Sequence, residues 1–276
     1  MPPRSATLSI MIKAAEKAAR GLKRDFGEVE NLQVSKKGPG DFVSISDKNA
    51  EETIKTELLK ARPDFAFYGE ESGNGGNEKA LDRFIVDPID GTTNFLHGIP
   101  HWSISIAYES RGEISSALVY DPIKDEMFFA EKGSGAYLNS RRLRVSSRKQ
   151  LEAASIATGI VPNDKDAMAL WSRQHEIMLP ACGGIRRFGG AALDMAYVAA
   201  GRHEGYWENI THPYDVAAGW LIVKEAGGIV TRIDGRAYKL GSHDILASND
   251  ALHTTLVKKL KEANATADSK PRKAAG

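Results

Sequence analysis

The chain has 276 residues, of which 42% are hydrophobic and 26% charged, enough for one large core or two closely packed halves. Its 37 basic residues nearly balance 36 acidic ones, so a net charge of +1 gives no reason to expect a nucleic-acid or membrane-surface protein. No apolar run approaches the length of a membrane span, and the single cysteine cannot form an intrachain disulfide. We therefore expect a cytoplasmic protein.

Apolar residues recur at helical spacing near the start of the chain. They predict a helix over residues 8–22 and a second from about Asp47 that stops before Pro63. A strand-rich middle follows, with a further hairpin over residues 135–145. The predicted strands cover residues 65–68, 84–86, 102–108, 114–120 and 127–130.

Strands and helices alternate in the second half of the chain. The predicted strands cover residues 155–158, 186–188, 205–208, 229–233 and 245–248. The predicted helices cover residues 167–179, 191–200 and 216–226, and a last one begins near residue 250. Runs of strands with interspersed helices indicate a layered mixed α/β (α+β) fold. We expect a single domain over residues 1–263, with two halves that meet near residue 150, and a disordered polar tail over 264–276.

Two aspartates directly follow the predicted buried strand at 84–86. Asp87 and Asp90 lie three residues apart on a turn that Pro88 stiffens and Gly91 allows to be tight. Carboxylates held on a rigid turn at the mouth of a sheet are well placed to bind hard cations. The alternative is a turn whose aspartates only cap a helix, and for an isolated Asp-x-x-Asp pattern that alternative would be preferred.

Two further carboxylates favour the metal site. Glu70 ends another short apolar segment, and Asp215 begins an alanine-rich helix, where by itself it could be only an N-cap. Together with Asp87 and Asp90 they would supply the hard oxygen ligands that two divalent cations need for an in-line displacement. Thr92 then opens a short helical turn, whose free N–H groups favour a phosphate.

Three segments share their pattern and order with one family. They are Gly69-Glu-Glu-Ser, Asp87-Pro-Ile-Asp-Gly-Thr-Thr-Asn-Phe and Tyr214-Asp-Val-Ala-Ala-Gly. In these motifs the chain resembles the inositol monophosphatase family of Mg²⁺-dependent, lithium-sensitive phosphatases, over about residues 6–262. The resemblance implies an α-β-α-β-α sandwich of the inositol monophosphatase and sugar phosphatase type, a homodimer, and two or three Mg²⁺ ions per site.

The resemblance also implies which residues hold the metals. Glu70 and Asp87, with the backbone carbonyl of Ile89, would bind the first ion. Asp87 would be shared with the second ion, which Asp90 and Asp215 would also bind.

The remaining implied roles concern catalysis and substrate binding. The implied catalytic residues, which include those that orient the attacking water, are Asp47, Glu70 and Thr92. The implied substrate-binding residues are Gly91, Thr92, Thr93, Ala191, Glu208 and Asp215.

The resemblance leaves the substrate open among phosphate monoesters. Relatives of the same fold act on histidinol phosphate, sugar phosphates or nucleotide phosphates. The pair Thr93-Asn94 favours inositol monophosphate, because histidinol-phosphate and nucleotide relatives often have Lys followed by Ser or Glu there. Tyr214 and Gly190 depart from the Trp and the Ser or Thr that are common in the family, which bears on the substrate pocket.

A function of another class is a non-catalytic binding role with the transcription machinery or RNA. The balanced charge argues against nucleic acid as the main partner. A complete set of metal-binding carboxylates also favours an enzyme, because such a set has no evident use in a protein that only binds.

Overall fold

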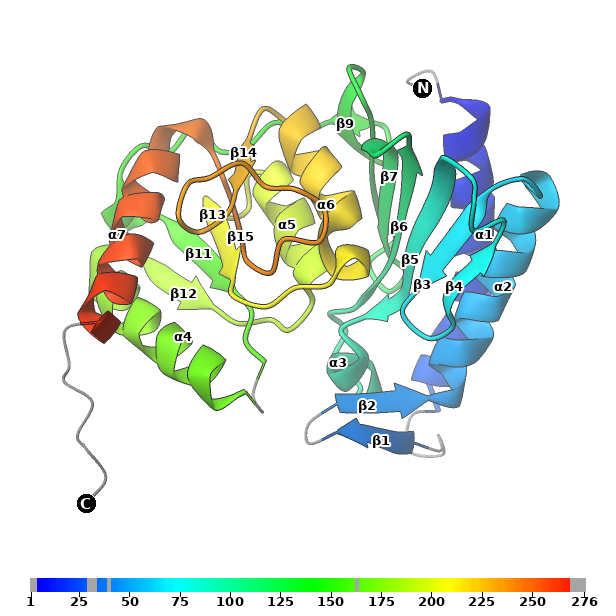
Figure 1. The fold of residues 1–276 in the computed structure, drawn as a ribbon, viewed down its shortest axis with the longest axis horizontal. Helices are drawn as coiled ribbons and strands as arrows, with labels where there is room; N and C mark the ends of the chain where they lie inside the picture. The colour runs from blue at the N-terminus through cyan, green and yellow to red at the C-terminus, as the bar shows by residue number, and fades with distance from the viewer. Residues whose placement is uncertain (1–3, 29–33, 39–40, 162–163, 269–276) are drawn as a thin grey trace.

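Helices and sheets alternate in five layers across the molecule (Figure 1). The structure, a computed structural model, describes residues 4–28, 34–38, 41–161 and 164–268. In order, the layers are α1 (Ala6–Phe26) with α2 (Ile45–Ala61), an eight-stranded sheet, α5 (Ala191–Ala199) with α6 (Pro213–Glu225), a five-stranded sheet, and α4 (Lys165–Met178) with α7 (Asp250–Asp268). This order confirms the mixed α/β fold and the layered sandwich expected from the sequence.

Helices α1 and α2 cover the outer face of the large sheet. Ser5 caps α1, because its hydroxyl accepts a hydrogen bond from the Leu8 N–H at 3.1 Å. The apolar stripe of α1 packs against α2, whose Ile54 and Leu58 are fully buried. Burying each such aliphatic side chain contributes about 1.5–3 kcal/mol.

The large sheet carries the first acidic segments. Its strand order is β10-β9-β8-β7-β6-β5-β3-β4, and all neighbours are antiparallel except β3 and β5. The strands are β3 (Ala66–Gly69), β4 (Gly73–Gly76), β5 (Asp82–Asp90), β6 (Ser103–Ser110), β7 (Glu113–Asp121), β8 (Glu126–Glu131), β9 (Gly135–Leu138) and β10 (Arg141–Arg142).

The small sheet lies wholly in the second half of the chain. Its order is β12-β11-β13-β15-β14, with β11 parallel to both of its neighbours. The strands are β11 (Ser155–Thr158), β12 (Gly184–Arg186), β13 (Gly205–Glu208), β14 (Ile229–Thr231) and β15 (Ile245–Ser248). The apolar face of α7 packs with α4 on the outer side of this sheet.

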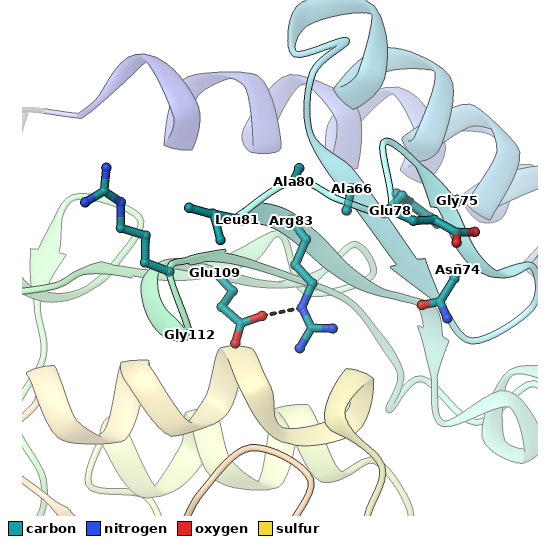
Figure 2. Close-up of a pocket in the computed structure, with 11 residues that line it drawn as sticks. Ala66, Asn74, Gly75, Glu78, Ala80, Leu81, Arg83, Glu109 and Gly112 are labelled. Carbon is teal, nitrogen blue, oxygen red and sulfur yellow. Dashed lines mark hydrogen bonds and ion pairs between the residues drawn. The ribbon is translucent and has the colours of Figure 1, made fainter.

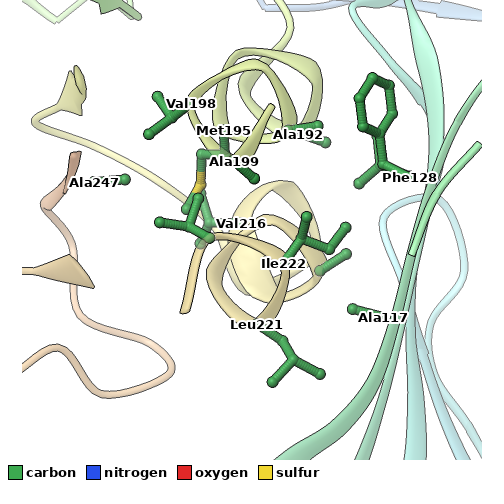
Figure 3. Packing of buried hydrophobic residues seen from close by; sticks show 14 of the residues in the cluster. Ala117, Phe128, Ala192, Met195, Val198, Ala199, Val216, Leu221, Ile222 and Ala247 are labelled. Atoms are coloured by element: carbon green, nitrogen blue, oxygen red, sulfur yellow. The ribbon is translucent and has the colours of Figure 1, made fainter. Parts of the chain in front are cut away.

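Helices α5 and α6 fill the layer between the two sheets (Figure 3). Side chains from both helices meet residues of both sheets, such as Phe128 of the large one and Ala247 of the small one. The two helices approach closely at Gly219, where an added Cβ would lie 2.7 Å from the Cβ of Met195. A side chain at this position would overpack the layer.

Several short elements were not expected from the sequence. They are β1 (Val34–Gly38) and β2 (Asp41–Ser44), which pair with each other, β4, and the 3₁₀ turns Leu151–Ala153 and Leu179–Ala181. The helical turn expected to open at Thr92 is present as α3 (Thr92–Leu96). The sequence of β4, Gly-Asn-Gly-Gly, has no apolar residue, so its strand state depends entirely on pairing with β3.

Some boundaries also differ from expectation. β5 continues to Asp90 instead of ending at residue 86, with an irregular stretch between Asp87 and Asp90 where the pairing register with β6 shifts. β12 lies two residues earlier than expected. Helix α7 continues to Asp268, past the expected boundary at residue 263, and residues 269–276 of the expected tail lie outside the described residues. Among the described helices, none has the length and apolar character needed to cross a membrane.

Two helical glycines allow a matched test of this packing. Gly219→Ala should lower the free energy of unfolding by about 1–2 kcal/mol, because overpacking outweighs the gain in helix propensity. Gly21→Ala, in α1, should raise it by up to about 1 kcal/mol, because nothing lies within 4 Å of the added Cβ. Urea denaturation of both variants measures this. Equal stabilisation by the two substitutions would contradict the close approach of α5 and α6.

Candidate active site

The parallel pairing of β3 and β5 brings the first two acidic residues together. Gly69 is paired with Val86, and the Glu70 N–H donates to the Val86 carbonyl at 3.1 Å. Glu70, directly after β3, and Asp87, within β5, therefore lie side by side at the same edge of the sheet. This is the edge where ligands commonly bind in parallel sheets.

The turn after Asp87 is held by its own side chains. The Asp87 carboxylate accepts the Ile89 N–H at 3.0 Å. The Thr92 hydroxyl lies 2.9 Å from the Ile89 carbonyl oxygen and 3.3 Å from Oδ2 of Asp47, which comes from α2. Gly91 has a φ of 94°, and an added Cβ would lie 3.1 Å from the His101 carbonyl oxygen, so glycine suits this position on both counts.

Asp90 joins the first half of the chain to the second. Its two carboxylate oxygens accept the backbone N–H groups of Ala191 and Ala192, each at 2.9 Å, at the start of α5. Gly190, where the family often has Ser or Thr, has no side chain to cap this helix. Asp90 supplies the missing cap from β5, and the positive end of the helix dipole favours its charge.

Asp215 lies at the third position of α6 and not at its N-cap. Its Oδ2 accepts the His212 N–H at 2.7 Å, which is one half of a capping box. Asp215 therefore helps to cap α6, although it is not the N-cap residue that the sequence allowed. This hydrogen bond does not exclude a role in metal binding, because the carboxylate also lies among other acidic groups.

Repulsion and burial perturb the acid–base behaviour of the aspartates. Burial, with the charges of Glu70, Asp90 and Asp215 nearby, raises the pKa of Asp87 well above its usual value. Burial likewise raises the pKa of Asp215 well above normal, and raises that of Asp90 to about 6 although the N–H groups of α5 oppose this. Such a cluster is stable at neutral pH only when protons or cations offset its charge.

The chemistry of these groups fits a hard divalent cation. Oxygen atoms of Asp47, Glu70 and Glu71 lie within 4.8 Å of one another, a spacing at which they could hold a metal ion. The candidate ligands are carboxylates and a backbone carbonyl, which suit Mg²⁺ or Ca²⁺ and not soft metals. The sequence analysis gave Glu71 no role, although its position beside Glu70 was the available signal.

A cavity of about 190 Å³ lies beside Asp90 and Asp215. Apart from Asp90, its lining residues belong to the second half of the chain. It is lined by four of the expected site residues, namely Asp90, Ala191, Glu208 and Asp215. The other expected residues do not line it. They lie at the start of α2, directly after β3, and from the last part of β5 into α3: Asp47, Glu70, Asp87, Ile89, Gly91, Thr92 and Thr93. The site therefore has two parts, a group of carboxylates and an adjoining hollow.

Three side chains in or behind the hollow were missed by the sequence analysis. Arg187 and Asp194 line it, and the Tyr206 hydroxyl donates a hydrogen bond to Glu208. Burial raises the pKa of Glu208 to about 7, and the positive charge of Arg187 opposes this rise. Tyr206 could have been found from its position two residues before Glu208 in a predicted strand, which places both side chains on the same face.

A larger hollow of about 610 Å³ lies elsewhere on the large sheet (Figure 2). It is lined by residues at the opposite end of β3 and β5 from Glu70 and Asp87, and by none of the expected site residues. Arg83, its central basic side chain, is ion-paired with Glu109. The candidate active site is therefore not the largest cavity.

Comparison with known proteins now identifies the family. Residues 4–265 match the family model described as the inositol monophosphatase family. The chain belongs to the inositol monophosphatase family. The inositol-1-monophosphatase of Rhizobium meliloti is 48% identical, over 92% of this chain and 95% of its own length. As a member of this family, the chain is a phosphatase.

Other relatives of this inositol monophosphatase family member have a different name. The crystal structure of an extragenic suppressor protein, suhB, from Bartonella henselae matches with a TM-score of 0.90 and 50% identity, and covers 94% of this chain and 99% of that one. A protein of Pseudomonas aeruginosa named Nus factor SuhB is 42% identical, over 90% of this chain and 95% of its own length. The same fold therefore occurs under both names.

The crowded carboxylates predict a stability effect in metal-free protein. Asp87→Asn should raise the free energy of unfolding at pH 8 by roughly 1–2 kcal/mol, because it removes a buried like charge and keeps an acceptor for the Ile89 N–H. The gain should shrink towards pH 5. In the unfolded chain Asp87 loses its proton near pH 3.8, whereas in the folded protein its raised pKa makes it keep the proton to higher pH. Above pH 3.8 the unfolded state therefore binds fewer protons than the folded state, so wild-type Asp87 lowers the free energy of unfolding more as the pH rises.

Asp82, at the other end of β5, provides the control. Hydrogen bonds from Ser110 and Tyr108 lower its pKa, so Asp82→Asn should bring no gain. Urea denaturation in the presence of a chelator compares the two variants with the wild-type chain. Destabilisation by Asp87→Asn at pH 8 would contradict the proposed repulsion.

Proposed function

We propose that the chain is a Mg²⁺-dependent phosphatase of small phosphate monoesters, with inositol monophosphate as the leading substrate. The observation that carries this proposal is the meeting of Glu70, Asp87, Asp90 and Asp215 from three parts of the chain, beside a hollow lined by Glu208. Glu70 and Asp87 directly follow the paired residues Gly69 and Val86, and Asp90 and Asp215 line the same hollow. The family membership supports the same reaction.

Five residues would hold the cations. Glu70, Asp87 and the Ile89 carbonyl would bind one ion, and Asp87, Asp90 and Asp215 a second, with two or three ions in the complete site. When bound, Mg²⁺ would supply charge to lower the pKa of water and to neutralise the phosphate. The hydrogen bonds to Asp87, Asp90 and Asp215 keep these ligands in place, so little rearrangement is needed on binding.

Asp47 and Thr92 would handle the attacking water. The Thr92 hydroxyl donates towards Oδ2 of Asp47 or the Ile89 carbonyl, so its oxygen is free to accept a hydrogen bond from water. A proton leaving that water can pass through Thr92 Oγ1 to the Asp47 carboxylate. Water would thus attack phosphorus directly, without a phosphoenzyme, and Gly91, Thr92 and Thr93 would contact the phosphate oxygens.

The hollow would bind the alcohol part of the substrate. Glu208 can accept hydrogen bonds from substrate hydroxyls, and its contact with Tyr206 fixes its orientation. Ala191 presents only a methyl group, which leaves room for a ring, and Arg187 lies at the same hollow. The ring hydroxyls of inositol monophosphate fit these groups. The pair Thr93-Asn94 is the feature that favours this substrate over histidinol phosphate and nucleotide phosphates.

Family membership is the support for three further parts of the proposal. We propose that the protein forms a homodimer, is inhibited by lithium and is located in the cytoplasm.

A second candidate function is binding to the transcription machinery. The similarity to a protein named Nus factor SuhB favours it. An affinity pull-down of RNA polymerase that persists with the Asp90→Asn variant would support a role separate from catalysis. If the wild-type protein captures no RNA polymerase under the same conditions, this second function is contradicted.

Phosphate release tests the enzymatic proposal. The wild-type chain should release phosphate from inositol 1-phosphate faster than from histidinol phosphate, only with Mg²⁺, and not with chelator. Asp90→Asn and Asp215→Asn should lower the rate by orders of magnitude while circular dichroism shows an intact fold, because each removes a charged ligand. Asp82→Asn, far along β5, should keep the wild-type rate.

Two results would change the proposal. Preference for histidinol phosphate would keep the reaction and replace the substrate. Near-wild-type turnover in both ligand variants would contradict the assigned metal site.

A further inference from the structure

Glu51 is a buried carboxylate with no role in the mechanism above. It follows Asp47 by four residues in α2, so the two side chains lie on the same face of the helix. Only 2% of Glu51 is exposed, which is rare for a glutamate unless its charge is satisfied by hydrogen bonds. The partners of this carboxylate therefore indicate what it does.

Both oxygens of Glu51 bind the turn that follows Glu70. Oε2 accepts the Glu71 N–H at 2.7 Å, and Oε1 accepts the Ser72 N–H at 2.8 Å. Gly69 and Gly73, which flank the turn, pair with each other as the last residues of β3 and the first of β4. The N–H groups within the turn lie outside this ladder. Hydrogen bonds from them to a carboxylate are about twice as strong as bonds between neutral groups.

Gly69 provides the space that this contact needs. An added Cβ there would lie 2.6 Å from the carboxyl carbon of Glu51 and 2.7 Å from Cε1 of Phe67. Its φ is not in the left-handed region, so the requirement for glycine is one of space and not of backbone conformation. The chain thus leaves out a side chain directly before Glu70 where the Glu51 carboxylate approaches.

Helix α2 therefore acts on the acidic group in two ways. Asp47 contributes an oxygen to the cluster with Glu70 and Glu71, while Glu51 binds the backbone of the turn that carries the other two members. Without these bonds, the three-residue turn would have a wider range of conformations. Binding of a cation would then also have to order the carboxylates of Glu70 and Glu71, and the entropy lost in doing so would weaken the binding.

We infer that Glu51 is a positioning residue that fixes the turn from Glu70 to Ser72 for the binding of a divalent cation. The inference rests on the proposed metal site. It separates two quantities, the affinity for the cation and the maximal rate at saturating cation. Loss of Glu51 weakens the affinity but changes the maximal rate little, because Glu51 is buried against the turn and is not among the residues proposed to contact substrate or the attacking water.

Three variants isolate the hydrogen bonds from the charge. Glu51→Gln keeps the shape of the side chain and only one of its two acceptors. Glu51→Asp keeps the charge but withdraws the carboxylate by one methylene from both N–H groups. Glu52→Gln, the control, removes the same charge from the neighbouring, exposed residue, whose carboxylate accepts a hydrogen bond from the Thr56 hydroxyl.

Cation binding is measured first, without substrate. Metal-depleted protein is titrated with Mn²⁺, and free Mn²⁺ is followed by electron paramagnetic resonance. Glu51→Gln should bind about tenfold more weakly, the usual effect of losing one charge-assisted hydrogen bond, and Glu51→Asp at least as weakly. Glu52→Gln should bind like the wild-type chain.

Phosphatase activity against Mg²⁺ concentration gives the second readout. Both Glu51 variants should need more Mg²⁺ for half-maximal rate, while the maximal rate stays within about threefold of wild type. Wild-type cation affinity in folded Glu51→Gln and Glu51→Asp would overturn the inference, and so would full affinity in Glu51→Asp alone, since charge would then suffice. Absence of Mn²⁺ binding to the wild-type chain would instead overturn the proposed function, and this inference with it.

Discussion

The structure depends on the burial of several carboxylates at one point between its two halves. Negative charges in such a place repel each other and lose their hydration. The raised pKa values of Asp87 and Asp215 express both effects, and that of Asp90 expresses the loss of hydration. The surrounding elements compensate in part. Backbone N–H groups at the start of α5 and before α6 bind Asp90 and Asp215. A cation would complete this compensation. The repulsion among the carboxylates would therefore favour the binding of a cation at this point.

Regular secondary structure supplies the precision that such a site needs. Glu70 and Asp87 are neighbours because β3 and β5 are the parallel pair in a sheet that is otherwise antiparallel. Asp47 and Glu51 are fixed one helical turn apart, and Asp215 lies in the first turn of α6. The residues proposed as ligands therefore lie in strands and helices or directly after a strand, where the geometry varies less than in long loops.

The apolar periodicity of α1, α2 and the long strands is strong, so the sequence predicted a layered mixed α/β fold, and the family resemblance added the order of the layers. Asp87 and Asp90 could be singled out because they follow the apolar run of residues 84–86 directly. The pairing of β4 was not visible, because its glycines have no pattern of their own. The partners of Glu51 were hidden because they lie about 20 residues away and meet it only through tertiary packing. The contact of Tyr206 with Glu208 is local to β13, where only their two-residue spacing indicates it, because neither residue stands in a motif that would reveal it.

The hydrogen bonds between Asp90 and α5 join residues that are 101 and 102 positions apart in the chain. Closing a loop of this length costs conformational entropy, which the contacts between the two halves must offset. The candidate active site is therefore complete only when the two halves have docked. During refolding, secondary structure should recover before catalytic competence, and a cation that binds across the junction would slow the separation of the halves once they have met.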